Sequence, residues 1–371
     1  MENSVLSAMK TDEILVTHGK SPAEMTLELL EAANLCALIG DTGKRVGLKP
    51  NLVVPRPAGE GATTHPEIVE ALVLYLHKHG FRNLVILEGS WLGARTTDAF
   101  AACGIVDIAK RHGVALVDTQ QDSHATHACA GMDIAICDSA MALDFLINLP
   151  VMKGHCQTGL TCALKNHKGL IPNREKRRFH TLGLHRPIAH LATAVHSRFV
   201  LADSICGDLD FEEGGNPVHT GRLFAARDPV LCDAWAAQQM GFPAGQVPYI
   251  PMAAALGAGC ADAGAARVRV LRESAAAGPA PRPTGKAQKL ARHISEDSAC
   301  SACTAALVRA LAQLDEGERR RLPGPVCVGQ GYRGRTGALG AGQCTAAFAH
   351  SAPGCPPTAA DLVCFLRENL A

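Results

Sequence analysis

Four cysteines near the C-terminus have a spacing suited to binding an iron-sulfur cluster. Cys300 and Cys303 form a C-x2-C pair, whose two thiolates can approach one metal or cluster from a single turn. Cys344 and Cys355 each follow a glycine, which lets the backbone approach a bulky group closely, and two prolines after Cys355 turn the chain away. These four thiolates complete the ligand set of one cluster, so we predict an iron-sulfur module here.

Two other uses of the C-x2-C pair remain open. Structural zinc sites usually present two short knuckles, whereas here one C-x2-C is joined by two single cysteines. A thioredoxin-type redox pair would need a strong strand before Cys300, and the sequence has none there. Cys327 lies in the strand-like PVCVG and Cys364 in the expected last helix, where burial accounts for both, so we exclude them as ligands.

The segments around the two single cysteines, GAGQCTAAF and PGCPPTAADL, resemble a known cluster-binding site. They are similar to the end of the small electron-transfer subunit of NADH:quinone oxidoreductase and of hydrogenases, where a glycine-cysteine segment and a Gly-Cys-Pro-Pro segment bind a 4Fe-4S cluster. The C-x2-C pair stands in place of that family's own first motif. The resemblance implies one 4Fe-4S cluster as the cofactor.

Polar residues that follow three apolar runs of the chain could bind a small anion. Lys49 and Asn51 follow RVGL, Glu88 and Ser90 follow or close NLVIL, and the long stretch of residues 153–169 follows FLINLPVM. Because α/β folds bind ligands where their strands end, we predict a substrate site at these positions. The predicted substrate-binding residues are Lys49, Asn51, Glu88, Ser90, Lys153, Thr158, Thr161 and Asn166.

The spacing of Thr158, Thr161 and Lys165 predicts a helix that carries two hydroxyls and an ammonium group on one face. Such a polar stripe usually faces solvent. A polar helix that begins at a strand end can instead hold a phosphate or carboxylate group. We therefore predict anion binding here, with Lys165 among the catalytic residues.

Two histidines are candidates for proton transfer. Thr64 and Glu67 have the spacing of a capping box, and Pro66 suits the first turn of a helix, which leaves His65 to point into a crevice. The helix dipole there is expected to lower the pKa of His65. We predict His65 or His155 as the proton donor or acceptor, because imidazole titrates nearest to neutral pH.

The basic run of residues 174–178 is expected to be a solvated loop, or else a clamp on an anionic substrate. In particular, we expect Lys176 to be exposed. The pairs His124 and His127, and His185 and His190, have no matching third ligand and are taken as ordinary histidines.

The overall composition excludes several classes of protein. Lys and Arg number 36 against 35 Asp and Glu, so the net charge creates no strong electrostatic field that would attract nucleic acid. Aromatic residues make up only 4%, so side chains on which bases could stack are also scarce. The sequence has no apolar run of membrane-spanning length and no secretory signal. We therefore expect a cytoplasmic location and no membrane partner. The 15 cysteines are therefore not expected to form disulfides.

Strand-like runs alternate with helical patterns up to about residue 272, which predicts a mainly parallel sheet with flanking helices. The proline-rich stretch AAAGPAPRPTGKAQK interrupts this pattern and is typical of a linker. We predict an α/β domain at residues 1–279 and a small α+β iron-sulfur domain at residues 280–371.

Several stretches together resemble the family catalogued as domain of unknown function 362. The likeness covers most of residues 45–245, in KPNLV, TTHPEIVEAL, ILEGS, LPVMKGHCQTGLTCALKNHKGLIP, VLADSI and RDPVLCDAWAAQQMG. After VLADSI, the family's usual glycine-rich stretch is replaced by CGDLDFEEGGNP. The resemblance implies an α/β fold, the site positions named above and a frequent connection to iron-sulfur segments, but no substrate.

We predict an oxygen-sensitive iron-sulfur enzyme, an oxidoreductase or lyase, that acts on a small anionic substrate. The cluster would have a redox or Lewis-acid role, and an electron-donor protein is a candidate partner. One alternative is a non-catalytic iron-sulfur protein for electron transfer or cofactor assembly. Another is a cluster that only stabilises the C-terminal domain.

Overall fold

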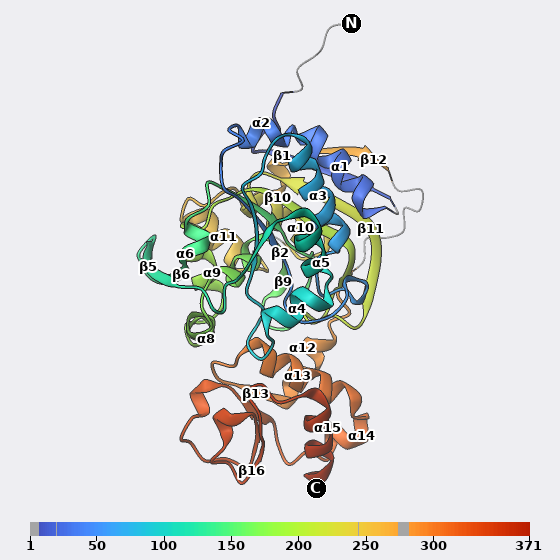
Figure 1. Cartoon of the computed structure of the whole chain (residues 1–371). Helices are drawn as coiled ribbons and strands as arrows, with labels where there is room; N and C mark the ends of the chain where they lie inside the picture. Colours follow the sequence, from blue (N-terminus) through green and yellow to red (C-terminus); the bar gives the residue numbers. More distant parts are fainter. Residues whose placement is uncertain (1–6, 20, 244, 274–281) are drawn as a thin grey trace, which may run out of the picture.

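The chain forms two bodies of unequal size in this computed structural model, which describes residues 7–19, 21–243, 245–273 and 282–371 (Figure 1). The elements up to β12 gather around a large sheet, and those from α12 onward form a smaller body. The predicted boundary near residue 280 lies outside the described residues, so a division at that residue stays a prediction. Each described helix is too short or too polar to span a membrane.

The larger body is built on an eight-stranded sheet with the strand order β12-β1-β11-β10-β7-β2-β3-β4. β11 runs antiparallel to both neighbours, and every other neighbouring pair of this sheet is parallel. The prediction of a mainly parallel sheet is therefore confirmed. The strands are β1 (Glu13–His18), β2 (Val46–Pro50), β3 (Leu84–Glu88), β4 (Ala115–Asp118), β7 (Phe145–Leu149), β10 (Ser197–Asp208), β11 (Pro217–Ala226) and β12 (Arg267–Arg272), and a separate hairpin comprises β5 (His124–Cys129) and β6 (Met132–Cys137).

Helices cover both faces of the sheet, because successive strand residues alternate between two apolar cores. Leu15 and Leu201 face the core beneath α1 and α3, whereas Ile14 and Val200 face the core beneath α9, α10 and α11. The helices are α1 (Pro22–Ala33), α2 (Leu35–Ile39), α3 (Pro66–Lys78), α4 (Thr96–Ala102), α5 (Ile105–His112), α6 (Asp138–Met141), α7 (Ala163–Asn166), α8 (Asn173–Thr181), α9 (His185–Leu191), α10 (Pro229–Gln239) and α11 (Tyr249–Ala255).

A short hairpin occupies the place where we predicted the start of a polar helix. β8 (Lys153–His155) pairs antiparallel with β9 (Gly159–Thr161), and α7 begins only after this hairpin. The prediction that Thr158, Thr161 and Lys165 share one helical face is therefore wrong. Gly159 permits the turn, since its φ of 76° lies in the left-handed region that glycine adopts without strain.

The smaller body has a four-stranded parallel sheet with the order β13-β14-β15-β16. Leu307 on α13 and Leu362 on α15 belong to a separate apolar core that also includes Val326 of β14. The predicted helix near residues 304–314, the strand PVCVG and the closing helix are confirmed. The elements are α12 (Lys286–Leu290), β13 (Ile294–Glu296), α13 (Ser301–Gln313), α14 (Glu316–Arg320), β14 (Val326–Val328), β15 (Leu339–Ala341), β16 (His350–Ala352) and α15 (Ala359–Glu368).

Hydrogen bonds and close packing hold the two bodies together beside the hairpin. The amide of Gln157 donates to the backbone oxygen of Ala299 at 3.1 Å and accepts from the hydroxyl of Ser301 at 2.7 Å. At Gly93, an added Cβ would lie 2.3 Å from Cδ of Pro356, so only glycine lets the loop after β3 pack on the cysteine-bearing segment. These contacts place the start of α13 directly against the larger body.

Candidate functional site

The four predicted ligand cysteines line a single cavity of the smaller body, which we call the cysteine cavity. Cys300 is the N-cap of α13, Cys344 lies in the turn after β15, and Cys355 follows β16. The carboxyl ends of parallel strands meet at one edge of a sheet, which explains how distant residues converge here. The cavity, with an empty volume of about 350 Å³, is lined by Arg177, Cys300, Cys303, Gly329, Gln330, Arg333, Ala341, Gly342, Gln343, Cys344, Gly354 and Cys355.

The glycines before two of the cysteines are required by the backbone. Gly342 and Gly354 have φ values of 90° and 117°, which other residues rarely adopt. An added Cβ on Gly354 would also lie 2.7 Å from Cα of Pro357. The two turns are joined by a hydrogen bond from the backbone N–H of Gln343 to the oxygen of Gly354, at 2.8 Å. The glycine-cysteine segments thus form one rigid wall of the cavity.

Polar groups of neighbouring residues point at the sulfurs. Gln330 donates to Sγ of Cys300 at 3.8 Å, and Nε of Arg333 donates to Sγ of Cys344 at 3.5 Å. Burial, and then the neighbouring thiols of Cys344 and Cys355, raise the pKa of Cys300 to about 11. Within the described residues, no three of the four sulfurs lie within 4.8 Å of one another. The four thiols therefore line one cavity without forming a set of three as tight as a single metal ion requires.

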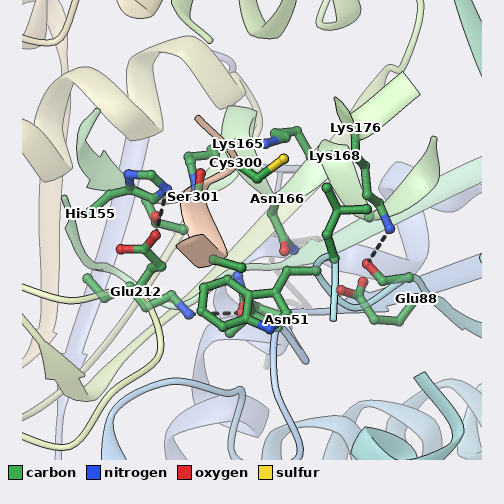
Figure 2. A pocket seen from close by; sticks show the side chains of 18 of the residues that line it. Asn51, Glu88, His155, Lys165, Asn166, Lys168, Lys176, Glu212, Cys300 and Ser301 are labelled. Carbon is green, nitrogen blue, oxygen red and sulfur yellow. Dashed lines mark hydrogen bonds and ion pairs between the residues drawn. The ribbon is translucent and has the colours of Figure 1, made fainter. Parts of the chain in front are cut away.

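A second cavity, the lysine cavity, lies between the larger body and the start of α13 (Figure 2). Its walls come from the ends of β2 and β3, the β8–β9 hairpin, α7, α8 and the loop after β10. The empty volume, including space open to solvent, is about 630 Å³. The lining residues are Asn51, Val53, Glu88, Gly89, Trp91, Leu92, Lys153, His155, Thr161, Lys165, Asn166, Lys168, Gly169, Lys176, His180, Glu212, Cys300, Ser301 and Ala302.

Four lysines give this cavity an excess of positive charge over its two carboxylates; Lys153 and Lys176 are buried, and Lys165 and Lys168 are half-buried. Burial lowers the pKa of Lys165 to about 8, and burial together with the charge of Lys165 lowers the pKa of Lys153 to about 7. Burial also lowers the pKa of Lys168 and, to about 8, that of Lys176. An anion in the cavity would favour the charged form of each lysine and offset the cost of burying it.

Lys49, which we predicted to bind substrate, lies behind the cavity and is fully buried. Its ammonium group pairs with Glu88 and donates to Oδ1 of Asn166 at 3.2 Å. Burial lowers the pKa of Lys49 and raises that of Glu88, while their mutual attraction opposes both shifts. Since Glu88 already compensates its charge, Lys49 orients the neighbouring side chains and does not reach the cavity.

His155 is fixed in one orientation at the edge of the cavity. Its Nδ1 accepts the backbone N–H groups of Gln157 at 3.0 Å and Thr158 at 3.2 Å, so this nitrogen carries no proton. In the neutral ring the proton is therefore on Nε2, which lies 3.2 Å from Oε1 of Glu212. Burial and the charge of Lys165 hold the pKa of His155 well below its usual value. The ring is a neutral N–H donor.

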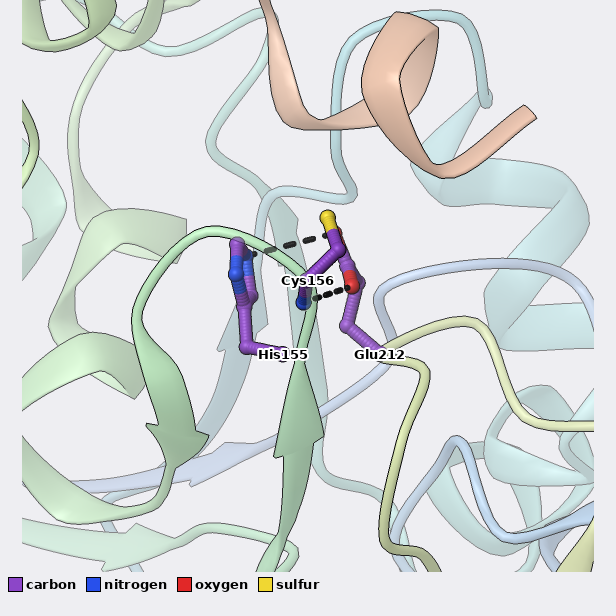
Figure 3. A group of neighbouring side chains, drawn as sticks. All are labelled: His155, Cys156 and Glu212. Atoms are coloured by element: carbon purple, nitrogen blue, oxygen red, sulfur yellow. Dashed lines mark hydrogen bonds and ion pairs between the residues drawn. The ribbon is translucent and has the colours of Figure 1, made fainter. Parts of the chain in front are cut away.

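His155, Cys156 and Glu212 are close enough to hold a metal ion, with their ligand atoms all within 4.8 Å (Figure 3). Cys156 donates its backbone N–H to Glu212 at 3.2 Å and its thiol to the same carboxylate at 3.4 Å. A metal on Nε2 of His155 would require a proton on Nδ1 or a deprotonated ring, and Nδ1 already faces two N–H donors. Cys156 and Glu212 are joined by hydrogen bonds, whereas Nε2 of His155 has no hydrogen-bond partner within the described residues.

A second group that is close enough for a metal, Cys162, Cys232 and Asp233, is completely buried. The carboxylate of Asp233 accepts the backbone N–H groups of Ala163 at 2.6 Å and Leu164 at 3.1 Å. It thus satisfies the first turn of α7, which is the structural role that an acidic residue at a helix start usually has.

Most of the predicted substrate-binding and catalytic residues lie together in the lysine cavity, and four do not. Those in the lining are Asn51, Glu88, Lys153, His155, Thr161, Lys165 and Asn166. Besides Lys49, Ser90 and Thr158 lie outside it: their hydroxyls donate to the backbone oxygens of Leu52 at 2.7 Å and Leu160 at 3.0 Å. These two residues shape the walls.

His65 is the fourth residue outside the cavity. It is the N-cap of α3, and its Nδ1 lies 2.8 Å from Oδ2 of Asp203. The predicted capping box is wrong, because the hydroxyl of Thr64 donates to the oxygen of Leu149 at 2.8 Å. The expected lowering of the His65 pKa is also wrong. Burial opposes the charged form, but the bond to Asp203 and its charge outweigh burial and raise the pKa.

The sequence interpretation missed several residues of the cavity, of which Lys176 is the plainest error. It is not in a solvated loop: it lies on α8, is 4% exposed, and donates to the backbone oxygens of Gly89 at 3.1 Å and Ser90 at 2.8 Å. Phe179 and His180 are buried on the same helical face at i+3 and i+4, a signal that the sequence contained. The other missed residues are Trp91, Lys168, His180, Glu212 and Ser301.

Comparison with known proteins gives one family match. The family described as "Domain of unknown function (DUF362)" matches residues 46–238. A thylakoid-associated protein of Synechocystis sp. is 25% identical over 202 residues, which are 52% of this chain and 61% of that relative. The chain therefore matches less than two thirds of the relative's length.

Two solved structures are distantly similar. The lactate racemase apoprotein from Thermoanaerobacterium thermosaccharolyticum has 15% identity and a TM-score of 0.39, with 61% of this chain and 55% of that chain covered. A Thermotoga maritima protein has 16% identity and a TM-score of 0.34, with 54% and 55% covered. At these TM-scores neither structure supports an inference about function.

Proposed function

This chain belongs to the DUF362 family, and from that premise we propose that it is an iron-sulfur enzyme acting on a small anion held in the lysine cavity. One observation carries the proposal: Cys300 lines both the cysteine cavity and the lysine cavity. A cluster bound by the four cysteines would therefore border the space in which the anion binds.

The spread of the four sulfurs supports a cluster over a zinc ion. A tetrahedral zinc site with Zn–S bonds of about 2.3 Å places its sulfurs about 3.8 Å apart. Among the described residues, no three of these sulfurs fall within 4.8 Å of one another. A 4Fe-4S cluster takes one thiolate at each iron and needs a wider set, and N–H donors near the sulfurs, here from Gln330 and Arg333, tune such clusters.

The charge of the lysine cavity supports a small anion as the substrate. Lys165 and Lys168 lie beside Cys300, and Lys176 lies near Glu88 at the far side (Figure 2). Each buried ammonium group gains from a negative partner, whereas a neutral ligand would leave the burial of these charges uncompensated. A carboxylate or phosphate group fits this chemistry, because both accept several N–H donors at once.

The residues of the cavity can bind, orient and protonate such an anion. The lysines neutralise its charge. The Nε2–H of His155, which has no hydrogen-bond partner within the described residues, is free to donate to an oxygen on which charge develops, as a preorganised neutral imidazole can. Because the pKa of Lys165 is about 8, its ammonium group can give up a proton near neutral pH. When bound by all four thiolates, the cluster would supply one electron at a time.

Two measurements on one anaerobic preparation test the proposal. Iron and acid-labile sulfide are determined chemically, and binding of malonate and of inorganic phosphate is measured by calorimetry. We expect iron and sulfide in near-equal amounts, together with saturable binding of at least one of the two anions. Zinc without sulfide would refute the cluster. Iron and sulfide without anion binding would favour the non-catalytic electron-transfer alternative.

A further inference from the structure

Two arginines line the cysteine cavity, and a third lies close to one of them in the sequence. Arg177, from α8 of the larger body, and Arg333, after β14, line the cavity itself. Arg335 lies two residues further along, and its side chain is 63% exposed. We call these three residues the arginine rim. The rim brings positive charge from both bodies to the surface beside the cysteines.

The surroundings of the rim contain little negative charge in the sequence. Residues 322–360, which include Arg333 and Arg335 as well as Cys344 and Cys355, contain no aspartate or glutamate. The acidic group that contacts the rim is Asp297, 3.5 Å from Arg335. The net charge of the whole chain is only +1, so this local excess is not a property of the protein in general. A positive surface of this kind favours an acidic partner.

The cysteines themselves face two directions. Cys355 is exposed and Cys344 is half-buried beneath Arg333, so both lie at the outer surface. Cys300 lines the lysine cavity as well, so it lies on the side toward the larger body. The cysteine cavity thus has an outer side toward solvent and an inner side toward the proposed substrate.

We infer that the arginine rim is the docking surface for an acidic electron-carrier protein of the ferredoxin or flavodoxin class. This inference rests on the proposed function, since a carrier has a reason to bind here only if the cysteines hold a redox group. Charge complementarity speeds and orients such encounters, and the exposed Cys355 brings the proposed cluster to the surface on which the carrier would dock. The small rim and the scarcity of aromatic residues favour a protein over a nucleic acid.

The test is a binding measurement on the anaerobic holoprotein with an acidic plant-type ferredoxin as the probe. At low salt we expect saturable binding that weakens steeply as salt is added. Arg335→Glu should weaken it by roughly three- to tenfold, and the double variant Arg333→Glu/Arg335→Glu by more. Arg335→Glu is informative by itself, because Arg333 contacts a cysteine sulfur and its replacement could disturb the module.

Two controls make the result specific. Arg320→Glu carries the same charge change on α14 of the same body, outside the rim, and should bind ferredoxin as the wild type does. A basic probe, cytochrome c, should not bind. Binding that is unaffected by Arg335→Glu and by the double variant, or equal binding of cytochrome c, would overturn the docking surface. Iron and sulfide are measured on each preparation: their absence overturns the proposed function and this inference together, whereas full content without arginine-dependent binding overturns the docking surface alone.

Discussion

The cysteine cavity and the lysine cavity share Cys300 but are constructed in different ways. The cysteine cavity takes its four thiols from one small body: Cys344 and Cys355 follow the parallel strands β15 and β16, and the other two lie at the start of α13. The lysine cavity takes its charged groups from strand ends, a hairpin, a short helix, a surface helix and the loop before β11. One cavity depends on local backbone turns, and the other depends on how remote segments pack.

This difference has a physical consequence for what each cavity tolerates. Thiolate ligation to a cluster needs a given atom at a given place, so the loss of one cysteine cannot be compensated by its neighbours. Anion binding sums several ammonium groups in a low-dielectric space, so the loss of one lysine leaves the others in place. A single substitution in the cysteine cavity should therefore abolish cluster binding, whereas a single substitution in the lysine cavity should only weaken anion binding.

The largest effect is expected from the ligand cysteines. Changing any one of Cys300, Cys303, Cys344 and Cys355 to serine should remove most of the iron and acid-labile sulfide, because a hydroxyl is a poor substitute for a thiolate. Cys327→Ser and Cys364→Ser are the matched controls and should retain both. Chemical analysis of anaerobically prepared protein checks this, and equal iron in all six variants would contradict the ligand assignment.

A smaller effect is expected from Lys165→Ala. Charge-assisted contacts are worth roughly 1.5–3 kcal/mol, so affinity for malonate or phosphate should fall about tenfold to a hundredfold. The iron content should not change, since Lys165 lines only the lysine cavity. Calorimetry on the variant and on Lys110→Ala, an exposed lysine, gives the comparison. Unchanged affinity in Lys165→Ala would move the anion site elsewhere.

A still smaller loss is expected from Lys176→Ala. This ammonium group already donates to two backbone oxygens, so it contributes less to an anion than Lys165 does. We expect affinity to fall roughly fivefold, in line with about 1 kcal/mol for one hydrogen bond. The same calorimetric titration measures it. A loss larger than that of Lys165→Ala would shift the centre of the anion site toward α8.

The smallest effect concerns His65, which lies outside both cavities. Its pKa is raised in the folded state by Asp203, so the charged pair stabilises the fold at a pH below about 6.5, and this stability is lost as pH rises through the folded pKa. His65→Asn keeps a good N-cap but removes the titration. Urea unfolding between about pH 5.5 and about pH 8.5 should show a stability decrease in the wild type that the variant lacks.

Both cavities serve as controls for this prediction. Iron content and anion affinity of His65→Asn should match those of the wild type, because His65 faces Asp203 and lines neither cavity. A loss of anion binding in this variant would restore the proton-transfer role that the sequence first indicated.

Much of the architecture could be predicted because local patterns matched the tertiary structure. For example, the strand EILVTH is followed by Ser21, which is the N-cap of α1. Strand-like and helical segments then keep alternating along the chain, and this alternation predicted the parallel sheet. The hairpin at residues 153–161 could not be predicted, because both strands are three residues long and the spacing of Thr158, Thr161 and Lys165 also satisfies a helix. The turn depends instead on Gly159 and on the ring of His155, which accepts two N–H groups.

Site residues that directly follow a strand could be predicted from the sequence. Residues that reach the cavity only through tertiary packing could not. Asn51, Glu88 and Lys153 lie at or just after strand ends and were found from that position. Lys176 was missed because a lysine in a basic run is normally solvated, and here two carbonyl groups and the cavity make its burial tolerable. Glu212 was missed because nothing local indicates that the loop after β10 folds over His155.

The central claim is that a cluster on the four cysteines borders the anion cavity, and EPR spectroscopy of the reduced anaerobic protein tests it most directly. The spectrum is recorded with and without malonate or phosphate at saturating concentration. We predict an iron-sulfur signal whose shape changes when the anion binds, and a smaller change in Lys165→Ala at the same anion concentration, because that variant binds less. The absence of an iron-sulfur signal, or a signal that stays identical while calorimetry shows the anion bound, would contradict the claim.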